Sequence, residues 1–579
     1  MWSVLPKALC SVLAVLSSLL TNGAGLVLES RIGKSTVVTI PANETTTAQL
    51  SVSVENISYV LIQFHCLSSN ISLSTNATFP YDATKRGTDV GILTLSGKRQ
   101  KTFTWYIHVE GFHDVTAVYY LDIHYADEPL PGGCNQVFNI PVDPSIVLKP
   151  GLHRTDVWFQ LANMAVDQDQ SFPNCESNMV LKNLTYDVYV YYLASRDLSQ
   201  EEYFDGVQKM LSPNDILLYG QKIFSFSDGP TSKSTVAVTS QASQGAAYAV
   251  LVTRLDTGLK AAYVTAVTYS CGTGKEDCTT AITGGKIVLS IVFGSLGTFL
   301  LFFGHRFFKV TQVLVGYGFS SLLLYIVMSV PQTFEDSVKL PVALSLGIVG
   351  GCLWLAFWFL YPFPVMSVFL AGLVTGYLIS SVLFITPLAN VTWWVTTFNY
   401  AMGFVCVILL FAVVLMAFTK LLSILSCAVI GGYLFLMSVA IPLQSSLRLV
   451  FLNSVYHQTE ENYLGVKVIF PFHTEDIILF TLWPPLVILG VVLQWHREKG
   501  RPAFDIPIWR GRTRSLEQVP QQYSENDEDE EENNTSSRGS DDERRWLLPA
   551  RNPGYGSSAG RNVPGNPRNG RSKNKNMLT

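Results

Sequence analysis

The chain has long stretches without a single ionisable side chain. Between Lys286 and His496, seven apolar segments contain no Asp, Glu, Lys, Arg or His. Each has about the length that a helix needs to cross the hydrocarbon core of a bilayer, where backbone groups must be satisfied within the helix. The sequence therefore predicts seven transmembrane helices, at Ile287–Phe303, Val310–Val330, Val342–Tyr361, Val365–Thr386, Tyr400–Phe418, Leu421–Leu443 and Ile477–Trp495.

Signatures of catalysis and of metal binding are also missing. No histidine lies within the seven segments, whereas intramembrane zinc hydrolases and ion-coupled pumps need His clusters or carboxylates there. His457 and His473 fall between the sixth and seventh segments, too far apart in sequence to suggest a site. No HExxH, nucleophile elbow or phosphate-binding loop occurs, and a net charge of −4 over 579 residues implies no nucleic-acid partner. We expect a protein that is not an enzyme and needs no metal or other cofactor.

Both ends of the chain predict its orientation. Lys7 precedes the apolar run Ala8–Leu20 and small residues follow it, as in a signal peptide. The part before Lys286, the head, then lies in the lumen or outside the cell, and seven crossings leave the C-terminus in the cytosol. The basic turns agree, because Arg306, Lys420 and Arg497 all fall on the predicted cytosolic side. We therefore predict a multi-pass protein of the plasma membrane.

The head has the patterning of β-strands. Residues alternate with period 2 over Tyr186–Tyr192, Thr116–Tyr125 and Ala247–Thr253, and a turn at Arg254–Gly258 leads into Ala261–Tyr269. A weak repeat, with Asn-Ile-Ser-Tyr at 56–59 and Asn-Leu-Thr-Tyr at 183–186, favours two tandem β-sandwich-like modules. The alternative is that such weak sequence repeats arise by chance in any β-rich head.

The head has few cysteines and several glycosylation sequons. Cys271 and Cys278 flank a short loop and can pair, and Cys134 with Cys175 is the natural second bridge, which leaves Cys66 as a buried thiol. The connectivity itself does not follow from sequence. We expect glycans at the sequons of Asn43, Asn56, Asn70, Asn76 and Asn183.

The even-numbered membrane segments share a Gly-Tyr pair. The spacings of 60 and 56 residues are those of one helical hairpin with its loops, so a first helix followed by three related hairpins is predicted. The glycines are expected to pack closely against neighbouring helices, and the tyrosines are candidates for lining a cavity. The pairs are Gly316-Tyr317, Gly376-Tyr377 and Gly432-Tyr433.

The tail after the last helix is polar and contains one recognisable signal. From about residue 511 it has the composition of a disordered segment. Glu543 lies four residues before Leu547 and Leu548, which fits the acidic dileucine pattern read by clathrin adaptors. We therefore predict cycling between the cell surface and endosomes or lysosomes.

These features divide the chain into five parts. We expect a signal peptide at 1–25, a first β module at 26–130, a second at 131–285, a seven-helix transmembrane domain at 286–496 and a cytosolic tail at 497–579.

Several segments, in this order and topology, resemble the transmembrane 7 superfamily member 3 family. They are Pro129–Asn135 (PLPGGCN), Phe302–Phe307 (FFGHRF), Arg497–Pro502 (REKGRP) and the Glu-Arg…Leu-Leu signal of the tail. The resemblance implies a non-enzymatic, pro-survival membrane protein that attenuates cellular and endoplasmic-reticulum stress. It supplies no catalytic or ligand-binding residue to carry over.

Two functions stay open. The first is a receptor-like protein whose glycosylated head binds a lumenal or extracellular ligand that the sequence cannot name. The second is a transporter or channel for a neutral or lipid-like substrate, favoured by the repeated hairpins. A polar cavity lined by Tyr317, Tyr377 and Tyr433 would favour transport, and a closed bundle would favour the receptor. Membrane lipid and a clathrin adaptor are the other expected partners.

Overall fold

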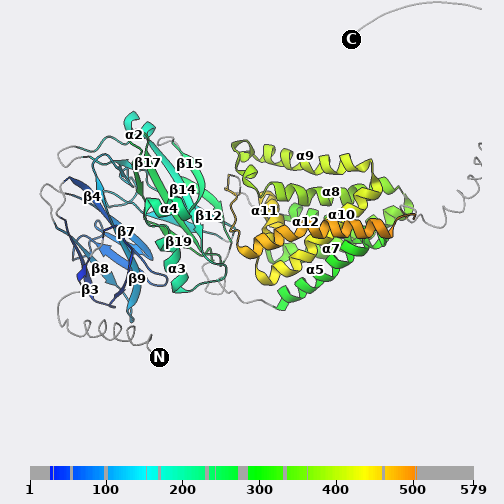
Figure 1. Ribbon diagram of the computed structural model, residues 1–579, viewed down its shortest axis with the longest axis horizontal. Coiled ribbons are helices and arrows are strands. Elements are labelled where there is room, and N and C mark those ends of the chain that lie inside the picture. Colours follow the sequence, from blue (N-terminus) through cyan, green and yellow to red (C-terminus); the bar gives the residue numbers. More distant parts are fainter. Residues whose placement is uncertain are drawn as a thin grey trace, which may run out of the picture. The chain divides into compact units, whose positions relative to one another are not determined.

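The computed structural model describes residues 27–29, 32–52, 56–96, 102–151, 153–166, 171–227, 234–241, 243–271, 284–329, 336–361, 363–459, 463, 465–501 and 504. The expected signal peptide and the sorting signal of Glu543, Leu547 and Leu548 lie outside these residues. The described chain forms a β-rich head and then a domain of long apolar helices, which confirms the predicted fold class (Figure 1).

The first half of the head is a β-sandwich. One sheet has the strand order β1-β3-β8-β5-β6 and the other β2-β9-β4-β7. Trp105 of β8 and Phe64 of β4 are fully buried in the core between them, as the many β-branched and aromatic residues of these strands favour. The strands are β1 (Val27–Glu29), β2 (Thr36–Ile40), β3 (Thr45–Ser51), β4 (Ile57–His65), β5 (Ile71–Ser74), β6 (Thr84–Gly87), β7 (Asp89–Leu95), β8 (Thr102–Val109) and β9 (Val115–Tyr125).

The second half is another sandwich, with short helices added. The sheet β15-β14-β17-β18, in which β19 also pairs with β17, shares one core with the smaller sheet β11-β12-β16. Tyr186, Val188 and Val190 of β14 are buried, as their period of 2 predicts. The elements are β10 (Pro129–Leu130), β11 (Ile146–Pro150), β12 (Arg154–Phe159), β13 (Asn163–Met164), α2 (Asn178–Asn183), β14 (Leu184–Tyr192), α3 (Gln200–Gln208), α4 (Pro213–Tyr219), β15 (Gln221–Phe226), β16 (Thr235–Thr239), β17 (Ala246–Arg254), β18 (Lys260–Ala262) and β19 (Ala266–Thr268).

Buried polar contacts join the two sandwiches. Lys85 Nζ lies 2.6 Å from Asp143 Oδ2, whose side chain is fully buried. Asp89 accepts hydrogen bonds from Tyr203 Oη at 2.7 Å and from the amide of Val267 at 3.2 Å. Because a buried charge is costly unless it is paired, these contacts favour one relative orientation of the sandwiches.

The seven predicted membrane helices are confirmed. Every end lies within three residues of its prediction except the start of α7, which begins six residues earlier. Two short 3₁₀ helices, η2 (Pro387–Asn390) and η3 (Thr392–Val395), connect α8 to α9. The spanning helices are α5 (Gly284–Phe303), α6 (Phe308–Ser329), α7 (Asp336–Leu360), α8 (Pro364–Leu383), α9 (Thr397–Met416), α10 (Thr419–Leu443) and α12 (Thr474–Arg497).

The segment between α10 and α12 is not only a loop. It contains a further helix, α11 (Leu447–Thr459), which is too short to span a bilayer. Polar residues such as Arg448, Asn453 and His457 interrupt its apolar pattern, so hydropathy does not reveal it. Leu447, Val450 and Ser454 are nevertheless buried, because α11 packs against the spanning helices.

The glycines of the three Gly-Tyr pairs each approach the partner helix of their predicted hairpin. A Cβ atom on Gly376 would lie 2.7 Å from the carbonyl oxygen of Ile408 on α9. A Cβ on Gly316 would come within 2.9 Å of α7, and one on Gly432 within 3.3 Å of α12. Each of the three glycines thus faces the partner helix of its predicted hairpin, α6–α7, α8–α9 or α10–α12, and the origin of the hairpins by duplication stays a prediction.

A bulky residue at Gly376 should destabilise the membrane domain. Because the backbone of α9 leaves no room for a Cβ atom, Gly376→Leu should cost about 1–3 kcal/mol through overpacking. Thermal melting of the full-length protein in detergent measures the loss. Gly318→Leu on α6 is the matched control, since a Cβ there meets nothing within 4 Å. Equal melting of both variants and the wild type would show that the close approach is unimportant.

Candidate functional site at the junction of head and helices

A segment of the membrane domain completes a sheet of the head. β16 is the edge strand of the sheet β11-β12-β16, and its outer edge pairs with Lys467. Lys467 belongs to residues 465–473 between α11 and α12, which we call the junction loop. The amide of Lys467 donates to the carbonyl of Ala237 at 2.7 Å, and the amide of Thr239 donates to the carbonyl of Lys467 at 3.0 Å. An edge strand offers such unpaired backbone groups to an extended segment. The junction loop therefore adds one parallel β-bridge to the edge of the head's sheet.

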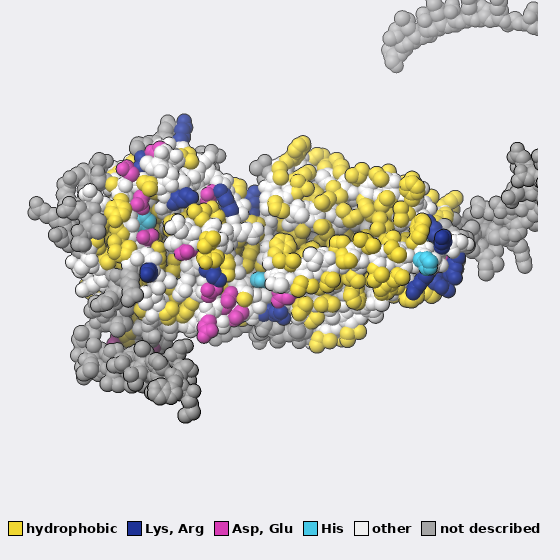
Figure 2. All heavy atoms as spheres, viewed as in Figure 1, with side chains coloured by type: hydrophobic (Ala, Val, Ile, Leu, Met, Phe, Trp, Pro, Cys, Tyr) yellow, Lys and Arg dark blue, Asp and Glu magenta, His cyan; other side chains and the backbone are white. Residues whose placement is uncertain are grey.

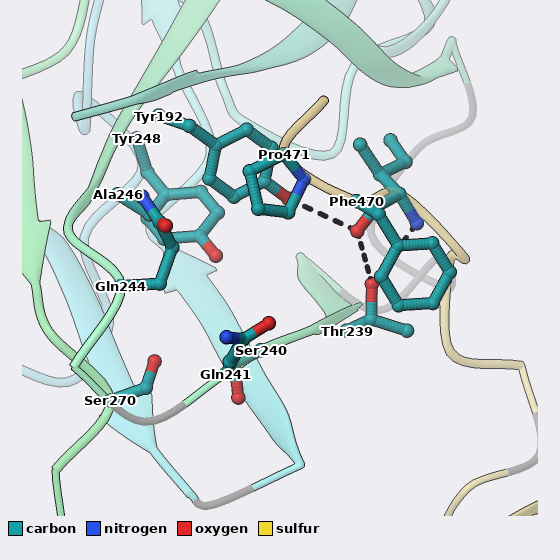
Figure 3. A pocket seen from close by; sticks show the side chains of 11 residues that line it. Tyr192, Thr239, Ser240, Gln241, Gln244, Ala246, Tyr248, Ser270, Phe470 and Pro471 are labelled. Atoms are coloured by element: carbon teal, nitrogen blue, oxygen red, sulfur yellow. Dashed lines mark hydrogen bonds between the residues drawn. The ribbon is translucent and has the colours of Figure 1, made fainter. Parts of the chain in front are cut away.

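Ile469 anchors the junction loop in the core of the second sandwich. Its side chain is 8% exposed and belongs to the apolar cluster of Phe159 and Val238. Thr239 Oγ1 donates to the carbonyl of Ile469 and accepts from its amide, and Tyr192 Oη donates to the same carbonyl at 3.1 Å (Figure 3). The head thus satisfies both backbone polar groups of Ile469.

Val468, between Lys467 and Ile469, is bonded to the membrane domain instead of the head. Asn390 of η2 donates through Nδ2 to the carbonyl of Val468 at 3.0 Å and accepts from its amide through Oδ1 at 2.8 Å. The junction loop is therefore tied to the α8–α9 connection as well as to the head.

Two glutamines of the head reach the ends of membrane helices. Gln244 Oε1 lies 3.0 Å from Nε2 of His473, the residue before α12, and Gln244 Nε2 donates to the carbonyl of Leu193 at 2.7 Å. This orientation of the amide makes His473 Nε2 the donor. Gln241 Nε2 donates to the carbonyl of Gln444, directly after α10, at 3.3 Å.

These contacts surround a small pocket. Its empty volume is about 270 Å³ with the open mouth included, but the part that a water-sized molecule can enter is about the size of one water. Sites for drug-sized ligands are usually roughly 300–1,000 Å³ of usable space. The junction is therefore a close-packed contact between the head and the helices, without room for a drug-sized ligand. Its lining, shown in Figure 3, is Tyr192, Thr239, Ser240, Gln241, Gln244, Ala246, Tyr248, Ser270, Ile469, Phe470 and Pro471.

A buried carboxylate joins the starts of α11 and α12. Asp476 is 1% exposed, and its Oδ1 accepts from Ser445 Oγ at 2.5 Å and from the amide of Ser446 at 2.7 Å. Its Oδ2 accepts from the amide of His473 at 3.1 Å. A carboxylate at helix N-termini is favoured by the free amides and by the helix dipole. Asp476 thereby fixes the junction loop where it enters α12.

Two tyrosines of the Gly-Tyr pairs hold α11. Tyr377 Oη lies 2.6 Å from Ser454 Oγ, to which Ser381 Oγ also donates at 3.1 Å. Tyr433 Oη donates to the carbonyl of Leu447 at 3.3 Å. The space that these two tyrosines face is therefore occupied by α11, not left as the cavity that was considered from the sequence. Tyr317 is half-buried, beside Gly351 of α7.

His457 sits in an aromatic environment near the end of α11. Its ring stacks on Tyr400 with 4.1 Å between centroids and meets Tyr463 edge-on at 4.8 Å. Neither ring nitrogen has a hydrogen-bond partner among the described residues. Burial lowers the pKa of His457 from 6.5 to about 4, because the charged imidazolium loses its hydration. His457 is therefore neutral at pH 7.

Burial also perturbs two cations of this region. It lowers the pKa of Arg448 on α11 and that of Lys467 in the junction loop. Lys467 Nζ lies 4.6 Å from the ring centroid of Phe224 and 3.4 Å from the carbonyl oxygen of Asn390. No ion pair of Arg448 or Lys467 occurs among the residues that the structure describes.

The stability of the protein should fall in acid, because His457 of α11 is buried in its neutral form. The folded-state pKa of His457 lies below its unfolded value, so the unfolded state binds more protons between about pH 4 and pH 6.5. The stability is complete above that window and is lost as the pH falls through it, by about 2 kcal/mol between pH 7 and pH 5.

Thermal melting of the full-length protein at both pH values measures this loss. His457→Phe keeps the stacked ring and should melt with a weaker pH dependence than the wild type. His496→Phe, at the exposed end of α12, is the control. If both variants keep the wild-type dependence, His457 is not the titrating group.

The other residues singled out in the sequence lie mostly in the head. Asn43, Asn56, Asn70 and Asn76 are exposed and Asn183 is half-buried. Glycosylation itself stays a prediction.

The cysteines of the head are largely paired. Cys134 and Cys175 form the favoured disulfide, with Cα atoms 5.8 Å apart. Cys271 is disulfide-bonded too, whereas Cys278 lies outside the described residues. Cys66 is a buried free thiol. Within the described ranges no group of three or more His, Cys, Asp and Glu side chains could hold a metal.

Sequence reasoning missed the junction. Gly465–Phe470 reads GVKVIF, and the alternation of Val466, Val468 and Phe470 is a strand pattern of period 2 between two helices. That signal could have identified an extended segment able to pair with the head. Thr239 and Gln244 carry no comparable signal, since only the fold brings them to the loop.

Three family models cover most of the chain. Residues 27–123 match the TM7SF3-like, N-terminal immunoglobulin-like domain, and residues 129–273 match the TM7SF3-like, second immunoglobulin-like domain. Residues 289–495 match the TM7S3/TM198-like domain.

Curated relatives agree with these matches. The human protein named transmembrane 7 superfamily member 3 is 30% identical over 461 residues, which are 78% of this chain and 79% of that protein. The rat and mouse proteins of the same name are 28% and 29% identical over 510 residues, 87% of this chain and 90% of theirs. The chain is a seven-pass membrane protein that belongs to the transmembrane 7 superfamily member 3 family.

Proposed function

We propose that the chain is a non-enzymatic, receptor-like membrane protein that attenuates cellular and endoplasmic-reticulum stress and so supports survival. In this proposal the glycosylated head binds a lumenal or extracellular partner. The junction loop then transmits the resulting conformational change of the head to the helices. The stress role comes from the family resemblance, and the receptor-like role comes from the geometry.

The observation that carries the proposal is the shared sheet. Lys467 pairs with β16, and Ile469 lies in the core of the second sandwich, four residues before His473 and five before the start of α12. A ligand that changes the packing of that sandwich would also change the strain on α12. A transporter would not need its extramembrane head to share a core residue with a helix connection.

Thr239 offers a direct test of this coupling. Thr239→Val keeps the shape of the side chain but removes the oxygen that bonds both backbone groups of Ile469, leaving its buried amide unsatisfied. That should weaken docking by about 1–3 kcal/mol. Cells that lack the chain are challenged with a calcium-pump inhibitor, and a stress reporter and survival are measured after rescue with each variant at equal expression.

The wild type should lower the stress reporter, and Thr239→Val should do so less. Thr235→Val is the matched control, because Thr235 is on the same strand but is exposed. If the wild type leaves the stress response unchanged, the proposed role is wrong. If Thr239→Val rescues as well as the wild type, the junction does not transmit the signal.

The second candidate is transport of a neutral or lipid-like substrate. It is favoured by the corresponding glycine contacts of the three hairpins, since transporters are often built from such repeats. It would require α11 to break its hydrogen bonds with Tyr377 and Tyr433 during each transport cycle. A flux of lipid or neutral solute into vesicles containing the purified chain would favour this alternative.

We also propose an orientation of the protein in the membrane and a trafficking route. The head faces the lumen or cell exterior, the C-terminus is cytosolic, and the signal of Glu543, Leu547 and Leu548 returns the protein from the plasma membrane to endosomes or lysosomes through a clathrin adaptor. The basic residues of the α5–α6 turn, of the start of α10 and of the end of α12 support this orientation.

Replacing the leucine pair should raise the amount at the cell surface. Leu547→Ala/Leu548→Ala removes the apolar contacts that an adaptor needs, so surface biotinylation should recover a larger fraction than for the wild type. Pro549→Ala is a neighbouring control. A C-terminal tag on the same proteins should react with antibody only after permeabilisation. Equal surface fractions would make the motif a chance match, and a tag accessible on intact cells would reverse the orientation.

A further inference from the structure

A cluster of cations lies at the end of the membrane helices where α5, α6, α10 and α12 meet. Figure 2 shows Lys and Arg side chains together with His at one end of the apolar helical surface. The cluster comes from three segments far apart in sequence: the α5–α6 turn, the start of α10 and the end of α12. Its members, called the basic face below, are Arg306, Lys309, Lys420, Arg497, Lys499 and Arg501.

A buried glutamine brings two of these segments together. Gln494 of α12 is 2% exposed, and its Nε2 donates to the carbonyls of Leu300 at 3.1 Å and Leu301 at 2.7 Å. Its Oε1 accepts from the amide of His305 at 3.0 Å. Because all the polar groups of this side chain are used across the α5–α12 contact, the α5–α6 turn is fixed beside the end of α12.

Two cations of the basic face complete the assembly. Lys420 Nζ donates to the carbonyl of Glu498 at 2.8 Å and lies 3.4 Å from that of Arg501, which docks the end of α12 onto the start of α10. Arg497 donates to the carbonyl of Phe302 at 3.3 Å. Carbonyl oxygens position these cations but do not neutralise their charge.

Very little negative charge opposes the basic face. Across the described residues of the four segments at this end, 304–309, 361–363, 416–420 and 496–501, the only carboxylate is Glu498, against six Lys and Arg side chains. Glu498 is 7% exposed and lies 3.8 Å from Arg501. Arg306, Lys309 and Lys499 are exposed.

Exposed apolar residues set the depth of the basic face in a bilayer. Phe303 is 40% exposed, Phe307 47% and Phe418 65%, and they flank Arg306 and Lys420 in sequence. Such side chains belong in the hydrocarbon, so the neighbouring cations lie at the level of the lipid phosphates.

We propose that the basic face is a binding site for the polyphosphorylated headgroup of a phosphoinositide in the cytosolic leaflet. Several phosphates on one inositol ring present a compact charge, which matches cations that hydrogen bonds have brought together from three segments. The rule that cytosolic loops are basic would be met by scattered charges and needs no such assembly. The proposal rests on the orientation proposed above.

Fluorescence polarisation of a short-chain fluorescent phosphatidylinositol 4,5-bisphosphate tests the site on the full-length protein in detergent. Both ends of the protein are accessible in detergent, so the result does not depend on orientation, which the C-terminal tag tests separately. We expect the bisphosphate lipid to bind about tenfold or more tightly than the corresponding phosphatidylserine probe, and to bind less tightly as salt is added.

Neutralising the exposed cations should weaken this binding. Arg306→Gln/Lys499→Gln/Arg501→Gln should lose roughly tenfold or more in affinity. Lys149→Gln/Lys182→Gln/Lys286→Gln, which removes three charges from the head and from the opposite end of α5, should bind like the wild type. Thermal melting checks that both are folded, and Lys499→Gln alone, with an expected loss of a fewfold, serves if the triple variant is not.

Three results would overturn the proposal. Equal affinity of the wild type and the basic-face variants would remove the site. Equal binding of the bisphosphate and phosphatidylserine probes would mean general attraction to an anionic surface. Equally tight binding of soluble inositol trisphosphate would mean that the ligand is a free phosphate ester instead of a membrane lipid.

Discussion

The six backbone polar groups of residues 467–469 each have a partner outside their own loop. The amide and carbonyl of Lys467 pair with β16, those of Val468 with the side chain of Asn390, and those of Ile469 with Thr239 and Tyr192. Backbone groups buried between the head and the helices have little water to bond, so they are stable only where protein groups replace that water. Since one partner strand belongs to the head and another partner to η2, the loop cannot be satisfied unless the head and the helices are docked together.

This arrangement sets the energy scale of the docking. Each hydrogen bond contributes only about 0.5–1.5 kcal/mol net, but the set, with the burial of Ile469, amounts to several kcal/mol. An undocked head would then be a rare state, populated at well under about 1%. A ligand could shift the population only by preferring one state by a comparable free energy. A receptor-like protein with this junction therefore needs a tightly bound partner, not a weak one.

The absence of charge from seven segments was enough to predict the spanning helices, because a bilayer imposes one length and one polarity on every crossing. The strands of the head followed from period-2 patterns such as that of β14. The junction did not follow, because its residues are functional only in context: Thr239 and Thr235 sit on the same strand, and nothing in the sequence tells which one faces Ile469. The Gly-Tyr pairs indicate where helices approach each other, most closely at Gly376 and Gly316, because the effect of a glycine on packing is local. The role of Tyr377 and Tyr433 depends on α11, whose polar residues hide it from a hydropathy pattern.

The two ends of the membrane helices differ in the exposure of their charged residues, because the head covers only one of them. At the junction most of the covered ionisable groups are neutral or hydrogen-bonded: His457 is uncharged at pH 7, Asp476 accepts three hydrogen bonds and Lys467 lies over an aromatic ring. Arg448 is the exception, since it is buried without an ion pair among the described residues. An unpaired buried charge is costly, so burial at this contact favours neutral or hydrogen-bonded groups. At the opposite end the hydrogen bonds of Gln494 and Lys420 hold the helices together without carboxylates, so the cations keep their full charge at the surface. Helix packing at that end thus leaves a concentrated positive field available for an anionic partner, whereas the junction buries its few ionisable groups.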